Sequence, residues 1–234
     1  MGARGVAIVG AAAAAIAAYE QRVKPWQESW GASDEELAMV LPGDEHLAEP
    51  ADQTTRAITI DAPREAVWPW LVQMGADRAG FYTYDALENA FGLGIHSADD
   101  IVEGWQDLAV GDIVYGDRRR TGGWIVVELR PAESLVMMVA NLEQGRPLRR
   151  DEQLGWEFLW NFALLDTPDG ATRLVVRERV AFDSTRTRLA MAPVGLTSFV
   201  MTRGMLRGIK ARVESHRPQV IDLRKLRAAL VPVP

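Results

Sequence analysis

The sequence predicts an α+β protein in which a curved antiparallel sheet wraps around one long C-terminal helix. Three observations predict this class: strand-like alternation through residues 112–182, one long amphipathic helix after it, and a strand followed by a helix before it. The chain has 234 residues, of which 48% are hydrophobic and 25% charged, so it can bury a sizeable core. Its 20 glycines and 12 prolines argue against an all-helical fold.

The first 53 residues differ in composition from the rest of the chain. Residues 1–24 contain the uncharged, alanine-rich stretch 5–19, which we expect to form an extra N-terminal helix outside the body. These helical residues reach only about 22 Å, short of the ~30 Å hydrocarbon core, so a membrane anchor, a cleaved signal and a packed helix all stay open. Residues 25–53 form an acidic lead-in. A short helix is predicted at 33–39, because Ser33 and Glu36 have capping-box spacing.

The body of the protein is predicted to contain five strands and two long helices, with one strand before the first helix and four strands between the helices. Strands are predicted at 54–61, 124–130, 135–140, 155–165 and 172–182, and helices at 64–74 and 193–216. In the strand at 124–130, we expect Ile125, Val127 and Leu129 to share one face.

The hairpin at 155–182 is the most informative part of the body. Its first strand places five apolar side chains on one face, namely Trp156, Phe158, Trp160, Phe162 and Leu164. A turn at 167–170 joins it to the second strand, where Arg177 and Arg179 share a face. On the concave face these arginines could hold a carboxylate or enolate oxygen, and on the outer face they would be solvated. Both positions stay open, and the outer face is favoured.

The helix at 193–216 carries Met201, Met205 and Ile209 on one ridge. We expect this ridge to meet the aromatic strand face across one cavity, to which nothing before Thr54 contributes. Gly204 and Gly208 are four residues apart, which suits a close approach of the helix to a sheet or a ligand.

Several stretches carry a resemblance to a known family: TTRAITIDAPREAVWPWLVQMG (54–75), RAGFYTYDALENAFGLGIHSADDI (78–101), GWQDLAVGD (104–112), the hairpin strands WEFLWNF and TRLVVRER, and FVMTRGMLRGIKARVE (199–214). In this order they resemble the START-like helix-grip superfamily (SRPBCC), and most closely its bacterial polyketide cyclase/dehydrase-type members. The resemblance covers about 54–216 and excludes a basic amphipathic tail at 217–234. It implies the architecture and leaves the chemistry open, because helix-grip proteins have diverse roles.

Residues 80–105 hold the densest run of polar and aromatic side chains. Its candidate catalytic residues are His96 as a proton carrier, Asp85 or Glu88 as the carboxylate that orients it, and Tyr82 as a donor to a substrate carbonyl. The alternative is that these groups satisfy the loop backbone and one another.

Bulky apolar side chains supply the candidate ligand-binding surface. The expected members are Tyr84, Trp105, Trp156, Phe158, Trp160, Phe199, Met201, Met205 and Ile209. The expected function is binding or carriage of a hydrophobic small molecule such as a lipid, polyketide or isoprenoid. The alternative is a cyclase or dehydratase that acts on such a ligand by acid–base chemistry.

Composition excludes several other kinds of site. The chain has no cysteine, its three histidines lie far apart, and no GxSxG motif is present, so we expect no metal and no cofactor. A net charge of −6 argues against nucleic acid as a partner. We expect a cytoplasmic or inner-membrane-associated protein, with residues 5–19, the basic stripe of the last helix and the basic tail as the membrane contacts.

Overall fold

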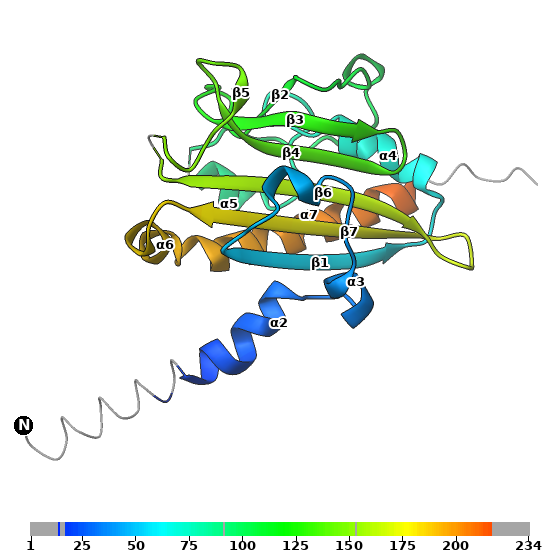
Figure 1. Ribbon diagram of the computed structural model, residues 1–234. Coiled ribbons are helices and arrows are strands. Elements are labelled where there is room, and N and C mark those ends of the chain that lie inside the picture. The colour runs from blue at the N-terminus through cyan, green and yellow to red at the C-terminus, as the bar shows by residue number, and fades with distance from the viewer. Residues whose placement is uncertain (1–13, 15–16, 91, 153, 217–234) are drawn as a thin grey trace, which may run out of the picture.

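The computed structural model describes residues 14, 17–90, 92–152 and 154–216, and it confirms the α+β class (Figure 1). Seven antiparallel strands form one sheet in the order β1-β7-β6-β4-β3-β2, with β5 paired to β4. The strands are β1 (Asp52–Ile60), β2 (Ile113–Tyr115), β3 (Gly123–Arg130), β4 (Ser134–Asn141), β5 (Arg146–Pro147), β6 (Trp156–Asp166) and β7 (Thr172–Phe182).

Most of the helices lie outside the sheet region of the sequence. They are η1 (Tyr19–Val23), α2 (Lys24–Glu28), α3 (Asp34–Ala38), η2 (Asp44–Leu47), α4 (Arg64–Val72), α5 (Asp85–Ala90), η3 (Glu103–Trp105), α6 (Thr185–Met191) and α7 (Val194–Ser215). The predicted capping box is present at α3, where the backbone N–H of Glu36 donates to the Ser33 hydroxyl and Ser33 N–H donates to the Glu36 carboxylate. The strand and helix predictions are confirmed to within a few residues at each end.

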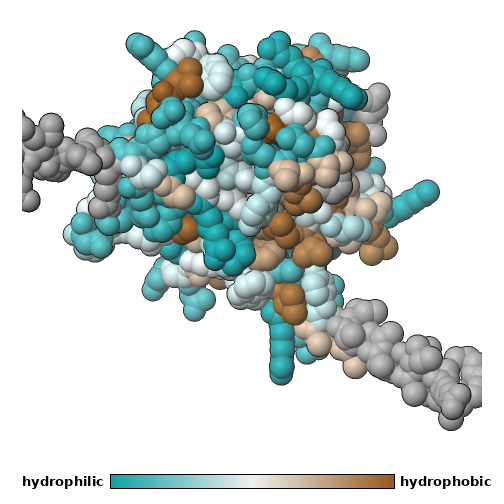
Figure 2. All heavy atoms as spheres, turned by 180° about the vertical axis from the view of Figure 1, so that it is seen from behind, coloured by the Kyte–Doolittle hydropathy of each residue, from teal (hydrophilic) through white to brown (hydrophobic). Residues whose placement is uncertain are grey.

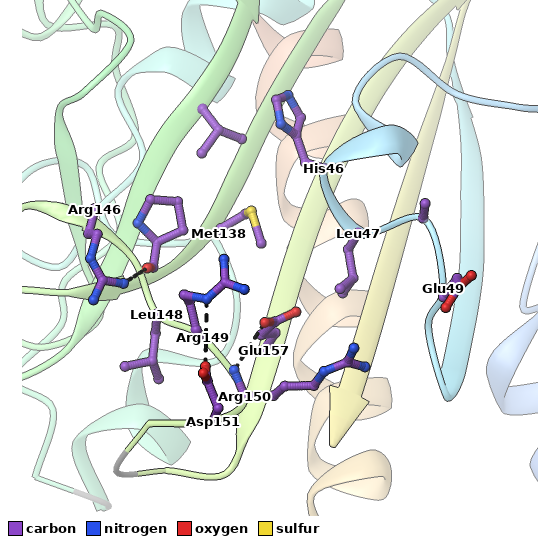
Figure 3. A pocket seen from close by; sticks show the side chains of 13 residues that line it. His46, Leu47, Glu49, Met138, Arg146, Leu148, Arg149, Arg150, Asp151 and Glu157 are labelled. Atoms are coloured by element: carbon purple, nitrogen blue, oxygen red, sulfur yellow. Dashed lines mark hydrogen bonds and ion pairs between the residues drawn. The ribbon is translucent and has the colours of Figure 1, made fainter. Parts of the chain in front are cut away.

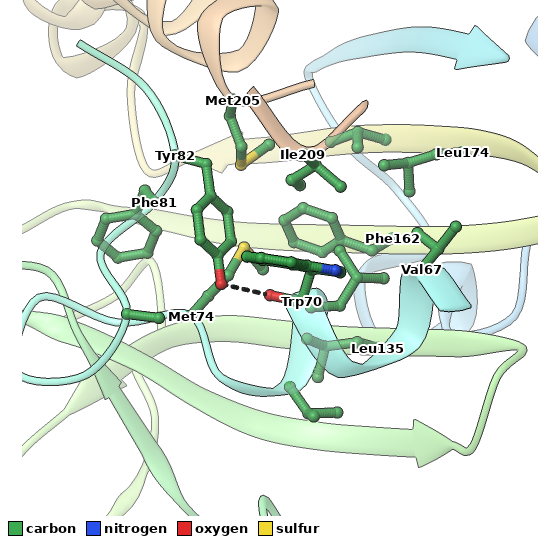
Figure 4. Close-up of a cluster of buried hydrophobic side chains, with 14 of the residues drawn as sticks. Val67, Trp70, Met74, Phe81, Tyr82, Leu135, Phe162, Leu174, Met205 and Ile209 are labelled. Carbon is green, nitrogen blue, oxygen red and sulfur yellow. Dashed lines mark hydrogen bonds between the residues drawn. The ribbon is translucent and has the colours of Figure 1, made fainter. Parts of the chain in front are cut away.

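The concave face of the sheet packs against α4 and α7. Alternation along β6 and β7 sends Phe162, Leu174 and their neighbours to this face, where they form one buried cluster with Trp70 of α4 and Ile209 of α7 (Figure 4). Burying each such side chain contributes about 1.5–3 kcal/mol. Met205 and Ile209 therefore share one cluster with the aromatic strand face, as predicted, whereas Met201 is only half-buried; the expected cavity between them stays a prediction.

Strand β3 departs from the predicted alternation. The register with β4 shifts between Val126 and Glu128, so a β-bulge falls at Val127. Val126 and Leu129 consequently both pack in the concave-face cluster, whereas Val127 packs on the opposite side of the sheet. The expectation that Val127 and Leu129 share a face was wrong, because the extra residue reverses the phase of the strand.

Residues 26–48 wrap around the edge of the sheet and cross its convex face. The backbone N–H of Ala57 on the edge strand donates to the Trp30 carbonyl, α3 lies beside the edge strand β1 (Figure 1), and η2 contacts β6 and β7. Trp30 also packs against the concave-face cluster, and Trp26 lies 5.2 Å from Phe199 of α7 between ring centroids. Residues before Thr54 therefore contribute to the packing around the core, which the sequence interpretation did not anticipate.

We call residues 26–48 the N-terminal arm. Their contacts show which face of the sheet Arg177 and Arg179 occupy and where two bases of α7 lie. Arg177 and Arg179 do lie on the outer face, as favoured, but the arm covers them, so they are not solvated. On α7, Arg203 and Arg207 stack on the ring of Trp30, with guanidinium-to-centroid distances of 5.2 and 5.7 Å. Arg203 and Arg207 belong to the basic stripe of the last helix, and both therefore contact the arm.

The glycines of α7 allow a close approach to the loop before α5. A Cβ added at Gly208 would overlap the carbonyl oxygen of Tyr82, and one at Gly204 would lie 2.7 Å from Cε2 of Tyr84. The close contact was predicted, but the neighbour of the helix is a loop and neither a sheet nor a ligand.

The two predicted membrane contacts at the chain ends fall mainly outside the described residues. This applies to residues 217–234 and to most of 5–19, of which Ala14, Ala17 and Ala18 are described and helical. Within the described ranges, no single helix is both long and apolar enough to cross a bilayer. Only α6 and α7 taken together, which meet at a bend of 50°, pass that test of length and composition.

Candidate functional site

A row of aromatic rings lines the concave face where β6 begins. Successive centroids along β6 are 6.3 Å apart from Trp156 to Phe158 and 6.4 Å from Phe158 to Trp160. Trp124 of β3 and Phe81 lie 5.1 and 6.1 Å from Trp160. We call these five residues the aromatic row. Trp124, Trp156 and Phe158 are only half-buried, so this end of the interior presents ring surface that the protein itself does not cover completely.

Trp160 adds one polar group to the aromatic row. Its ring is buried, and its Nε1–H has no hydrogen-bond partner among the described residues. A buried indole N–H without an acceptor costs free energy, so such groups are usually satisfied. A bound molecule that carries a carbonyl or hydroxyl oxygen could satisfy it.

The opposite end of the interior is filled by side chains. Trp70, Phe162, Leu174 and Ile209 interdigitate there, and each is at most 1% exposed (Figure 4). Met205 belongs to the same cluster. Met205 and Ile209, both expected to bind ligand, therefore serve as the inner wall of the core.

The Tyr82 hydroxyl makes two hydrogen bonds within the protein, one as donor and one as acceptor. The hydroxyl donates to the Trp70 carbonyl at 3.0 Å and accepts from Nε2 of Gln73 at 2.9 Å. Burial raises the pKa of Tyr82 against the smaller opposing effects of Gln73 and two arginines. The predicted donor to a substrate is thus engaged with the backbone of α4, which corresponds to the alternative interpretation of this loop.

Asp85 and His96 form the predicted carboxylate–histidine pair, but on the surface. Nδ1 of His96 lies 3.1 Å from Oδ2 of Asp85, and the His96 side chain is 89% exposed. The Asp85 carboxylate accepts from both the backbone N–H and the hydroxyl of Ser97. Partial burial opposes its ionisation, yet these hydrogen bonds and His96 outweigh burial and lower the pKa of Asp85. The pair organises the loop, and His96 does not point into the interior.

Glu88 is a candidate catalytic residue whose carboxyl group is buried. It lies one turn after Asp85 on α5, is 1% exposed, and its Oε2 has no hydrogen-bond partner among the described residues. Burial, aided by the charge of Asp85, raises the pKa of Glu88 to about 7. Two neighbouring carboxyl groups therefore have pKa values shifted in opposite directions, which is the pattern of acid–base sites.

A buried ion pair between β1, β7 and α7 was missed by the sequence interpretation. Nη1 of Arg56 lies 3.1 Å from Oε2 of Glu178, and both side chains are buried. The Glu178 carboxylate also accepts from the hydroxyls of Ser198 and Thr202, each at 2.6 Å. The strand alternation that puts Val176 inward also puts Glu178 inward, so the signal was available.

The remaining predicted ligand residues are dispersed. Phe199 is buried between the Trp26 ring and the Arg56 guanidinium, whose carbon lies 5.7 Å from its centroid. Met201 accepts a weak hydrogen bond from Thr83 at the start of α5. Trp105 packs at the margin of the core, and Tyr84 is exposed against Gly204. Of this set, the structure brings Trp156, Phe158 and Trp160 together.

A groove of about 700 Å³ opens on the convex face, between η2 and the segment around β5 (Figure 3). Its apolar floor includes Leu47, Met138 and Leu148, and its rim carries charges of both signs. At its margin, ligand atoms of Glu45, His46 and Glu128 lie within 4.8 Å of one another and could hold a metal ion. Arg130 already lies 2.6 Å from the Glu128 carboxylate and competes for it.

Comparisons with known proteins identify no family for the chain. No family model and no curated protein matches the chain. A solved protein from Mesorhizobium loti is 13% identical, with 71% of this chain and 100% of that chain covered at a TM-score of 0.41. One from Arthrobacter aurescens is 16% identical, with 73% and 90% covered at 0.41.

A third similar structure is described as a protein in the dynemicin biosynthetic locus. It is 14% identical, with 68% of this chain and 47% of that chain covered at a TM-score of 0.41. The curved sheet and long helix fit a helix-grip fold. At these identities and scores, the similarities carry no conclusion about family or chemistry.

Proposed function

We propose that the protein binds a hydrophobic small molecule at the aromatic row. The observation that carries this proposal is the half-buried state of Trp124, Trp156 and Phe158 beside a buried Trp160 whose N–H lacks a partner. Binding pockets combine mostly apolar walls with a few oriented polar groups. The matching ligand has a flat or flexible apolar body and one oxygen acceptor, as lipids, polyketides and isoprenoids do.

The filled end of the interior limits where such a ligand lies. Because Trp70, Phe162 and Ile209 occupy that end, the ligand would sit between the start of β6 and the first turns of α7, near Met201. The loop that holds Phe81 leads directly into α5, whose preceding Thr83 contacts Met201.

Ligand extraction and a matched pair of variants test this proposal. We expect native mass spectrometry of the purified protein to show a co-purifying apolar molecule, or binding of added oleate or an anthraquinone. The double variant Trp156→Ala/Phe158→Ala should lose the adduct, whereas Phe162→Leu at the filled end should lower stability and retain it. Equal binding by the wild type and the double variant would overturn the proposal.

Glu88 favours a second candidate function, acid–base catalysis on the same ligand class. A buried carboxyl with a pKa of about 7 can donate and accept a proton at neutral pH. In the dehydration of a β-hydroxy ketone, the Glu88 carboxylate would take the α-proton to form the enolate and then return that proton to the departing hydroxyl, so that water leaves as the enone forms and the carboxylate is regenerated. The measurement is enone formation from such ketones, followed by NMR. Glu88→Gln should lower the rate by about 10²–10⁴-fold, and His96→Ala should leave it unchanged, because His96 lies outside.

A further inference from the structure

The connection between α6 and α7 exposes a continuous apolar segment. Its eight residues are Leu189, Ala190, Met191, Ala192, Pro193, Val194, Gly195 and Leu196, none of which is charged. All except Met191 are exposed, with Leu189 at 70% and Leu196 at 50%, and α6 contributes no buried residue. We call residues 189–196 the apolar tip. An exposed apolar surface of this kind marks an interaction site, since water solvates it poorly.

A second apolar element reaches the same corner of the molecule. Trp26 of α2 is half-exposed and contacts Phe199, one turn beyond the tip on α7. Val23 and Tyr19, which precede it, are also exposed. Apolar side chains accordingly gather at the lower right of Figure 2. That figure shows the molecule from behind, so this corner corresponds to the lower left of Figure 1, where α2 and α6 lie.

Helices α6 and α7, which meet at the tip, together pass the test of length and composition for a membrane segment, and this favours a lipid surface over an apolar protein partner. Arg186 and Arg188 precede the tip on α6, and both are exposed. Arg22 and Lys24 lie on the neighbouring N-terminal helices. Asp52 and Glu20 pair with Arg188 and Lys24, and Glu28 and Asp183 lie on the same helices or beside them, so the acids equal the four bases in number. Apolar insertion must therefore supply most of the binding.

We propose that the apolar tip inserts shallowly into the interface of a lipid bilayer, beside the exposed side chains of Tyr19, Val23 and Trp26. One weak apolar signal gives reversible membrane binding, and two signals at one corner give stable binding. This goes beyond the proposed function, since it involves neither the aromatic row nor Glu88. It also orients the protein, because Met201 follows the tip on α7 and would lie near the lipid surface.

The absence of cysteine allows a direct test with the full-length chain. Leu196→Cys, labelled with an environment-sensitive nitrobenzoxadiazole fluorophore, should show a blue shift and a rise in emission on vesicles of phosphatidylcholine and phosphatidylserine. The matched control is Val110→Cys with the same label, because Val110 is an equally exposed apolar residue outside the tip. A control that responds as strongly as the tip position would overturn the proposal.

Vesicle flotation of an unlabelled variant gives the second measurement. Leu189→Asp/Leu196→Asp should lower the partition coefficient at least about tenfold, which corresponds to about 1.4 kcal/mol. Val110→Asp should match the wild type, and all three proteins should unfold at the same denaturant concentration, since the substituted side chains are not buried. Absence of wild-type binding, or unchanged binding of the double variant, would overturn the proposal. So would a wild-type dimer that the double variant dissociates, since a second copy would then cover the tip.

Discussion

Nη1 of Arg177 on β7 lies 2.6 Å from Oδ2 of Asp44 in η2, across 133 residues of sequence. The side chains are 2% and 9% exposed. Arg177 also donates to the Thr55 hydroxyl and to the backbone carbonyls of Met39 and Glu36. One guanidinium thereby fastens the N-terminal arm to the convex face of the sheet.

The first prediction concerns this ion pair. Asp44→Asn should lower the free energy of unfolding by about 3–5 kcal/mol, because it leaves the Arg177 charge buried without its partner. The control is Asp52→Asn, which breaks the exposed pair with Arg188 and should cost no more than about 1 kcal/mol. Urea denaturation measures both. Similar losses in the two variants would show that the arm is not fastened at Asp44.

The second prediction uses three glycines of one helix. Gly208→Ala should cost about 1–3 kcal/mol or more, since its new methyl group overlaps backbone that cannot move alone. Gly204→Ala should cost less, because the exposed Tyr84 ring can rotate away. Gly195→Ala meets nothing within 4 Å and should be neutral or stabilising by up to about 1 kcal/mol. Thermal and urea unfolding of the three variants give the order, and any other order contradicts the close packing of α7 on the 82–84 loop.

The third prediction is a pH dependence set by Glu88. Its pKa is raised from 4.5 to about 7 on folding, so the folded state binds the proton more tightly than the unfolded state. The wild type should therefore lose stability relative to Glu88→Gln as the pH rises from about 4.5 to about 7, with a constant difference above that range. Urea unfolding at several pH values measures the difference. A difference that does not vary with pH would mean that Glu88 is solvated.

The fourth prediction has the opposite sign and concerns Glu178. Burial opposes its ionisation, but Arg56, Ser198 and Thr202 outweigh burial and lower the pKa of Glu178. Its contribution to stability is therefore present above pH 4.5 and is lost as the pH falls through the lowered pKa. Glu178→Gln should cost about 3–5 kcal/mol at neutral pH, because Arg56 stays buried and unpaired. The gap to the wild type should narrow only in acid, and a gap that narrows between pH 5 and 7 would contradict the assignment.

The candidate site could be predicted in part. The alternation of β6 predicts that Trp156, Phe158 and Trp160 share a face, and the spacing of residues 85–96 suggested a carboxylate near His96; both are confirmed. The roles within that loop could not be predicted. Whether Glu88 or His96 is buried depends on how the loop folds against the rest of the molecule, and the contacts of this loop with Gly204 and Gly208 of α7 join residues more than 100 positions apart.

The sequence by itself determined the fold class, the strands and helices of the body, and the hairpin turn at 167–170. Those features follow from the period of the side-chain pattern and from local turn and capping chemistry, which act over a few residues. The tertiary structure alone decided that the acidic lead-in covers Arg177 and Arg179, that β3 changes phase at Val127, and that Glu88 is buried while His96 is exposed. Each of these depends on which distant surface meets the segment. Pairing across the sheet and burial against a helix are set by topology, which no local pattern specifies.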